Sequence, residues 1–531
     1  MVTVADWIVI LAYLAGIATL GVFWSRGQRS HRDYFLGNRS LPWWVVGLSI
    51  VATETSALTF IGVPAMAIGR LRLGAHGRII AEGGNLRFAQ LALGYVIARV
   101  VVAMHMVPHY FRGDVYTPYQ LLRRTFGPWP RTLAAAMAVL NMCLQAGVRV
   151  YVTAIPVAIM IRTVYPGWGI WESIVLFAGV SILYSVAGGI RAVVWTDMVQ
   201  FFIFIISGLY ALLYIPTLLS APGGATGWSA LVELGREKLS LFHLGLDSVG
   251  DLLGGDFNIW MGLVGATVGV MVSHGADQLN VQRVLACRDE RGGRRALFLS
   301  AAIIGPQFLM FLLIGVGLFA LYAPSGFDLG GIPPWDPTVV GAFAAPKADY
   351  VFPIFIVTRI PPVVRGVMIA GVLASAMSSL TSALTAISSV VVMDLYRPLR
   401  GAAGAGPAAP GTPARRDVAL GRVGTLLAGL VLIGVAWWAK DAPLVFNLVF
   451  QFAGVFAGAK LGSLLLSMWA ARRERDRSGA GPVIGGMIAS AALMAVIVLL
   501  VKNDLLQLRW PWYPAIGTLV CLGVVRVLGQ R

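Results

Sequence analysis

The chain has 531 residues, of which 58% are hydrophobic and 12% charged, and its mean hydropathy is +0.78. Soluble globular domains are about 45–50% apolar and about 25% charged, so this composition excludes a soluble enzyme, a disordered chain and a disulfide scaffold. The net charge of +17 comes from short basic clusters between long apolar runs, which is typical of membrane topology. We therefore expect a polytopic membrane protein that binds no nucleic acid.

Apolar runs long enough to cross a bilayer, about 20 residues each, recur along the whole chain. The first run is included because it is too long for a signal-peptide core and lacks a basic leader. Thirteen spanning helices are predicted, over residues 5–24, 43–67, 88–107, 132–161, 171–187, 193–216, 257–275, 297–322, 365–392, 418–438, 444–469, 483–501 and 512–528.

The distribution of Lys and Arg predicts the orientation, because basic residues are enriched on the cytoplasmic side. With the N-terminus outside and the C-terminus in the cytoplasm, 25 of these 41 residues lie inside, 13 outside and 3 within spans. Residues 68–87 are an exception, since they should face outside yet contain four arginines. The stretch 399–414, rich in Ala, Gly and Pro, is predicted to be a flexible cytoplasmic linker.

Motifs narrow the class of protein. No Gly-Lys dipeptide occurs, so there is no Walker A loop, and none of the six histidines precedes Glu, so the zinc-protease helix is absent. The three cysteines have no spacing typical of disulfides or transition-metal sites. A transporter driven by an ion gradient is the leading class, with a channel, an intramembrane enzyme or a membrane sensor as alternatives.

The span 365–392 carries a dense set of small hydroxyl residues. Ser375, Ser378 and Ser379 stand at i, i+3 and i+4, so they share one helix face. Neutral hydroxyls and backbone carbonyls can form a weak, reversible site for a monovalent cation. The alternative is close helix packing, which Ser and Thr also favour in membranes.

Residues 49–64, in the second span, combine the carboxylate of Glu54 with several hydroxyls and a Gly-x-Pro sequence. This combination indicates an interrupted helix whose free carbonyls line a cavity. An acidic residue inside a span is a functional-site hypothesis. The alternative for Glu54 is a protonated acid that hydrogen-bonds in a helix interface.

The order of several motifs resembles the sodium:solute symporter family, which includes sodium/glucose, iodide, proline and sialic-acid symporters. The resemblance implies an all-α polytopic membrane protein of thirteen transmembrane helices with a leucine-transporter-type core, two inverted repeats of five helices whose first helices are broken at mid-membrane. The matching segments are 33–44, 49–64, 188–200, 277–283, 352–353 and 374–396. The implied domains are an N-terminal helix and loop (1–42), the first repeat (43–216), an extracellular connection (217–256), the second repeat (257–469) and two peripheral helices (470–531).

The resemblance also implies a sodium site formed by carbonyls on the broken helix and by the hydroxyl face. Asp197 corresponds to a second sodium ligand or to a carboxylate of the inner pathway in some relatives. The alternative is that Asp197 is simply a charged residue at the cytoplasmic end of its helix. For Arg99 and Lys460, which lie inside spans, we expect side chains that snorkel to the membrane surface or pair with acidic groups, and no role in transport. The implied ligands are the carbonyls of Ala52, Thr55 and Ser375 and the hydroxyls of Ser378 and Ser379.

The implied substrate pocket includes Arg149, and a family arginine in this helix binds the carboxylate of sialic acid. A guanidinium binds a carboxylate with two parallel hydrogen bonds, so we expect an organic anion such as a sugar acid. A structural Glu54–Arg149 ion pair is the alternative role for Arg149, and Ser273 replaces the inner-gate tyrosine of sugar transporters. The implied pocket residues are Glu54, Ser56, Thr59, Gln90 and Arg149.

The sequence thus predicts a sodium-coupled symporter of the inner cell membrane that is not an enzyme and imports a small organic solute by alternating access. Na+ is the expected coupling ion, with no organic cofactor, transition metal or obligate protein partner. A neutral sugar, an amino acid or a vitamin is the alternative substrate, and a transporter-like sensor is the alternative function. The segment 69–84 lies outside every motif and is expected to be a loop peripheral to transport.

Overall fold

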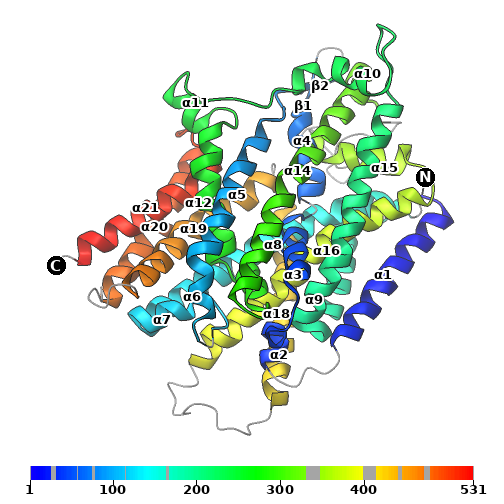
Figure 1. The fold of residues 1–531 in the computed structure, drawn as a ribbon. Coiled ribbons are helices and arrows are strands. Elements are labelled where there is room, and N and C mark those ends of the chain that lie inside the picture. The colour runs from blue at the N-terminus through cyan, green and yellow to red at the C-terminus, as the bar shows by residue number, and fades with distance from the viewer. Residues whose placement is uncertain are drawn as a thin grey trace.

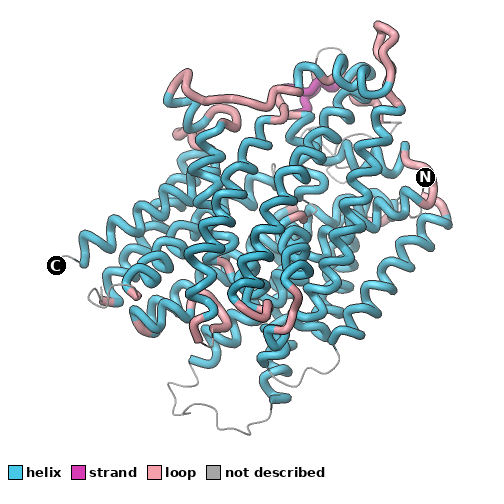
Figure 2. Tube along the Cα trace, in the orientation of Figure 1, coloured by secondary structure: helices cyan, strands magenta, loops and turns pink. Residues whose placement is uncertain are grey.

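The computed structural model describes helices that run side by side between the two ends of one bundle (Figures 1 and 2). The linker predicted at 399–414 lies, apart from Ala414, outside the described residues. The described residues are 2–25, 31–56, 58–74, 78–113, 115–162, 165, 167–329, 347–398, 414–440, 445–471 and 479–529.

Among the described residues, ten helices are long and apolar enough to cross a membrane. Their apolar side chains point both inward and outward: α20 buries Val483 and Met487 and exposes Val496 and Leu499. This pattern is typical of a helix with protein on one side and lipid on the other. The ten are α1 (Val4–Ser25), α5 with α6 (Leu91–Val101 and Val107–Phe111), α8 (Pro128–Arg162), the second half of α9 (Ile170–Thr217), α14 (Glu290–Tyr322), α16 (Val364–Val390), α18 (Ala414–Ala439), α19 (Val445–Ala470), α20 (Ala480–Lys502) and α21 (Tyr513–Gly529).

Three further apolar segments occupy the remaining predicted spans. α3 (Trp43–Glu54) and the helix that leads from Leu58 into α4 (Val63–Ile68) meet at an angle of 59°. Two shorter apolar helices follow, Ile170–Leu183 at the start of α9 and Met261–Ala276, which contains α12 (Thr267–Met271). Length and composition therefore qualify ten helices as spans, or eleven with the bent pair, and the number thirteen stays a prediction.

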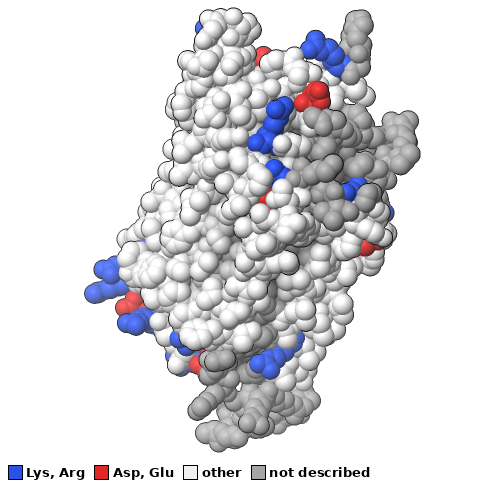
Figure 3. All heavy atoms as spheres, turned by 90° about the vertical axis from the view of Figure 1, so that its right-hand side faces the viewer, with Lys and Arg blue, Asp and Glu red and all other residues white. Residues whose placement is uncertain are grey.

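Short helices lie at the two ends of the bundle. Figure 1 places α10 (Gly227–Leu234) and α11 (Val249–Gly254) at its upper end, and α2 (His31–Leu36) and α7 (Gln120–Phe126) at its lower end. On the face drawn in Figure 3, a broad uncharged band separates charged side chains towards the two ends, as expected for a surface in contact with lipid. The remaining short helices are α13 (Gln278–Leu285) and α15 (Val351–Arg359).

The described residues of the segment 69–84 form a hairpin of two antiparallel strands, so the expectation of a loop was wrong. β1 (Arg70–Leu73) pairs with β2 (Ile79–Glu82) at the upper end of the bundle (Figure 2). Leu71 and Ile79 are buried in the main core, whereas their strand neighbours Arg70, Arg72 and Ile80 are exposed. This alternation is the two-residue period of a strand. Strands of four residues are too short to appear in a search for apolar runs that could span a membrane.

Glycines allow the two ends of the hairpin to approach each other closely. Gly69 and Gly84 have φ values of 98° and 76°, in the left-handed region that favours glycine. A Cβ atom on either residue would lie 2.4 Å from a neighbouring backbone atom. The two ends of the hairpin therefore touch each other, which anchors it above α4.

We predict that the hairpin contributes to stability through the buried side chain of Leu71. Leu71→Ala should lower the melting temperature of the purified protein in detergent, because truncating a buried leucine costs about 2–5 kcal/mol. Leu73→Ala, on the same strand, removes an exposed side chain and should leave the melting temperature unchanged. Equal melting temperatures for the two variants would show that the hairpin does not pack on the bundle.

Candidate functional site

The bend between α3 and α4 interrupts the helical hydrogen bonding. α3 ends at Glu54, and Thr55 departs from helical geometry with φ −80° and ψ 82°. The hydroxyl of Thr55 accepts a hydrogen bond from Gln307 on α14, and the Ser56 N–H donates to the carbonyl of Glu54 at 3.0 Å. A helix end leaves carbonyl groups without intrahelical partners, so this break presents backbone oxygens to neighbouring helices.

α16 faces the break with buried hydroxyls. The Ser379 hydroxyl donates to the Thr53 carbonyl on α3 at 3.0 Å and to the Ser375 carbonyl at 3.1 Å, so one side chain joins the two helices. The Ser378 side chain, one residue earlier on α16, is also buried. These two helices carry the predicted sodium ligands Ala52, Thr55, Ser375, Ser378 and Ser379, all of which are buried.

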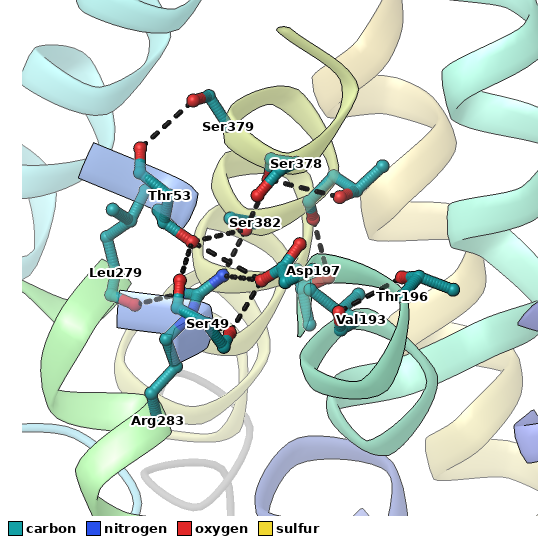
Figure 4. A network of polar contacts seen from close by, with 12 residues as sticks. Ser49, Thr53, Val193, Thr196, Asp197, Leu279, Arg283, Ser378, Ser379 and Ser382 are labelled. Atoms are coloured by element: carbon teal, nitrogen blue, oxygen red, sulfur yellow. Dashed lines mark hydrogen bonds and ion pairs between the residues drawn. The ribbon is translucent and has the colours of Figure 1, made fainter. Parts of the chain in front are cut away.

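Asp197, on α9, lies in a buried polar network beside these residues (Figure 4). Its Oδ2 accepts hydrogen bonds from Ser49 at 2.6 Å, Thr53 at 3.3 Å and Arg283 at 2.9 Å. Arg283, on α13, also donates to Ser382 on α16 and to the Ser49 hydroxyl at 2.9 Å. One ion pair with its hydroxyl neighbours therefore holds α3, α9, α13 and α16 together.

A cavity of about 200 Å³ lies beside the break. Thr53 and Leu279 belong both to its wall and to the Asp197 network, so that network lies at one edge of the cavity. The described residues of its wall include four of the five predicted substrate residues, Glu54, Ser56, Thr59 and Arg149.

The structure places Gln90 away from the cavity. Its side-chain amide donates to the Phe257 carbonyl at 3.1 Å and accepts from the His243 N–H at 3.2 Å. Both partners lie in or just after the connection that leads from α9 to α12. Gln90 therefore links the start of α5 to this connection, a contact between distant segments that no local sequence pattern reveals.

The acidic side chains of the cavity wall are paired, and one cation is not. Glu54 forms an ion pair with Arg99 on α5, and Asp277 forms one with Lys460 on α19 at 2.9 Å. These contacts confirm that Arg99 and Lys460 are paired. Arg149, on α8, makes no ion pair within the described ranges, and its Nε atom is buried without a hydrogen-bond partner there. The alternative Glu54–Arg149 ion pair is therefore not formed, because Arg99 takes this place.

Sequence reasoning missed part of the cavity wall. His274 and Asn280 line it, as do Trp510 and Pro511 in the segment between α20 and α21. A histidine inside an apolar span is a signal that the sequence offers. The other contributions depend on tertiary packing: a Cβ atom on Gly265 would lie 2.6 Å from the Pro511 carbonyl, so only the close approach of these segments brings the C-terminal region to the cavity.

The chain is similar to sodium symporters along most of its length. It is 25% identical to the sodium/sialic acid symporter SiaT of Proteus mirabilis over 97% of this chain and 92% of that protein. It is 25% identical to the sodium/glucose cotransporter of Vibrio parahaemolyticus, over 90% and 82% respectively. The human sodium/iodide cotransporter is 27% identical over 83% of this chain, which spans 62% of that longer protein.

Solved structures show the same fold. The substrate-bound, outward-open structure of a Na+-coupled sialic acid symporter superimposes with a TM-score of 0.77 at 22% identity, covering 99% of this chain and 98% of that one. Mhp1, a nucleobase-cation-symport-1 family transporter in a closed conformation, gives a TM-score of 0.52 at 13% identity, covering 95% and 96%. The expected leucine-transporter-type core is thereby confirmed.

The family model of the sodium:solute symporters matches residues 34–489, which is most of the chain. Apolar helices that can cross a membrane and relatives that are sodium symporters agree with this match. This integral membrane protein therefore belongs to the sodium:solute symporter family.

Proposed function

We propose that this sodium-coupled symporter imports a small organic anion, a sugar acid or another carboxylate, by alternating access. The observation that carries the proposal is the unpaired guanidinium of Arg149 in the cavity wall. An ionised group at such a depth is costly without a partner, and its planar fork suits a carboxylate. Relatives named for sialic acid support the same chemical class.

The charges around the cavity favour a solute with a single negative charge. Arg99 compensates Glu54 and Lys460 compensates Asp277, so each acidic group of the wall already has its cation. Arg149 adds one positive charge to this balanced set. A neutral sugar would leave that charge unpaired, and a second solute carboxylate would find no free cation among the described residues of the wall.

The proposed sodium site lies between the break and α16. Na+ prefers oxygen ligands, and the carbonyls of Ala52, Thr55 and Ser375 with the hydroxyls of Ser378 and Ser379 would supply them. Sodium bound there would hold α3 against α16 and thereby order the cavity wall that begins at Thr53. Asp197 is the proposed second sodium contact, close to the same hydroxyl face.

The proposed orientation places the N-terminus outside and the C-terminus in the cytoplasm, as the distribution of Lys and Arg favours. The Asp197–Arg283 network would then close the cytoplasmic side of the cavity, and the hairpin of β1 and β2 would lie outside. Release inward requires that network to open. Loss of sodium to the cytoplasm would then free the solute as well.

We predict that sodium alone raises the melting temperature of the purified protein, because a ligand that binds only the folded state stabilises it. The double variant Ser378→Ala, Ser379→Ala should lose this shift and lose sodium-driven uptake. Thr385→Val is the control, since Thr385 lies on the same helix and its hydroxyl donates, among the described residues, to the Thr381 carbonyl alone, at 2.8 Å. A double variant with unchanged sodium dependence would contradict the site.

We also predict that Arg149→Lys weakens solute uptake about tenfold or more while the sodium-induced shift in melting temperature remains. Lysine retains the charge but cannot form two parallel hydrogen bonds with a carboxylate. The measurement is uptake into proteoliposomes under a sodium gradient, with carboxylates and neutral sugars compared. A wild-type preference for neutral sugars over every carboxylate would overturn the anionic substrate.

A further inference from the structure

Two buried polar side chains share the cavity wall with Arg149 and carry atoms that the fold does not use. His274 is 1% exposed and Asn280 is 3% exposed, and both line the cavity. The Nε2 atom of His274 and the Oδ1 atom of Asn280 have no hydrogen-bond partner within the described ranges. Buried polar atoms are almost always hydrogen-bonded in proteins, so two such atoms in one cavity indicate a ligand that pairs with them.

Neighbouring hydrogen bonds determine which atom of each side chain remains for the solute. The Asn280 amide nitrogen donates to the Ser273 carbonyl at 3.0 Å, which leaves Oδ1 as an acceptor. The His274 Nδ1 atom lies 2.9 Å from the Ser273 hydroxyl, which leaves Nε2 on the other side of the ring. Ser273 thus orients both side chains from one position.

No described charged group of the cavity forms a hydrogen bond with either of these two atoms. The His274 Nε2 atom lies 3.8 Å from the Glu54 carboxylate, which is beyond the distance of a direct hydrogen bond. Glu54 is already in an ion pair with Arg99. Asn280 is uncharged. The two atoms therefore suit a neutral polar group of the solute, whereas Arg149 suits its charged group.

We propose that His274 and Asn280 determine specificity by hydrogen-bonding an uncharged polar arm of the solute. The transported anion is then a carboxylate with hydroxyl or amide groups, and not an alkyl carboxylate. This inference rests on the proposed function, because it assumes that Arg149 binds the carboxylate. An alkyl chain in the same position leaves both buried atoms unpaired, and a site built for hydrogen bonds rejects such an analogue strongly.

The test compares two matched pairs of acids, gluconate with hexanoate and lactate with propionate. Binding to the purified full-length protein is measured by calorimetry in sodium buffer. We expect the wild type to bind the hydroxylated acid of at least one pair tenfold or more tightly than its alkyl partner. Asn280→Leu and His274→Leu should each reduce that preference about tenfold, chiefly by weakening the hydroxylated acid.

Two further variants separate specificity from folding. Gln200→Leu removes a buried amide outside the cavity, whose nitrogen donates to the Tyr13 hydroxyl at 3.1 Å, and should keep the preference. His274→Gln retains a polar atom in place of the ring and should keep more of the preference than His274→Leu. For each variant, the melting temperature and its shift in sodium show whether the protein is folded.

The outcomes distinguish this inference from the function on which it rests. If the wild type binds both members of each pair equally, or if the leucine variants weaken both members equally, His274 and Asn280 do not determine specificity and the anionic substrate stands. If the wild type binds none of the four acids in sodium, the anionic substrate itself is contradicted, and the inference falls with it.

Discussion

Charge compensation inside the bundle is the constraint on which the site depends. A charge removed from water costs several kcal/mol unless an opposite charge and hydrogen bonds lie beside it. Glu54, Asp277 and Asp197 meet this requirement with Arg99, Lys460 and Arg283. Each pair joins two different helices, so the pairs also set how these helices are placed around the cavity. Against this background Arg149 is distinctive, because it makes no ion pair with any of the described residues.

The bend between α3 and α4 connects the proposed sodium site to the cavity. Thr53 offers its carbonyl to Ser379 on α16 and its hydroxyl to Asp197, while the next residue, Glu54, faces the cavity. A continuous helix would use the carbonyl oxygens in its own hydrogen bonds. Two neighbouring residues at the break, Thr53 and Glu54, therefore contact the proposed sodium site, the Asp197 network and the cavity. A change in one of these contacts would alter the others.

Sequence patterns predicted what is local and missed what depends on distant contacts. The position of the break, the shared face of Ser375, Ser378 and Ser379, and the placement of Arg149 in the cavity wall follow from spacing and family motifs. The partner of Glu54 could not be predicted, because Arg99 and Arg149 both lie in neighbouring spans and only packing selects between them. The displacement of Gln90 and the contribution of Trp510 arise in the same way, from segments that meet in three dimensions. The hairpin in the segment 69–84 was not predicted, because its strands have only four residues each.

An anionic solute changes the energetics of coupling. One Na+ carried with a monoanion moves no net charge, so the membrane potential contributes nothing and a tenfold sodium gradient supplies about 1.4 kcal/mol, or tenfold accumulation. A second Na+ adds about 2.3 kcal/mol per 100 mV and the same chemical contribution again, which is worth a further few hundredfold. If that second ion binds at Asp197, it competes with the guanidinium of Arg283 for the same carboxylate. Weakening that ion pair loosens the contact among α3, α9, α13 and α16, so binding of the second ion and opening of this side of the bundle would be physically linked.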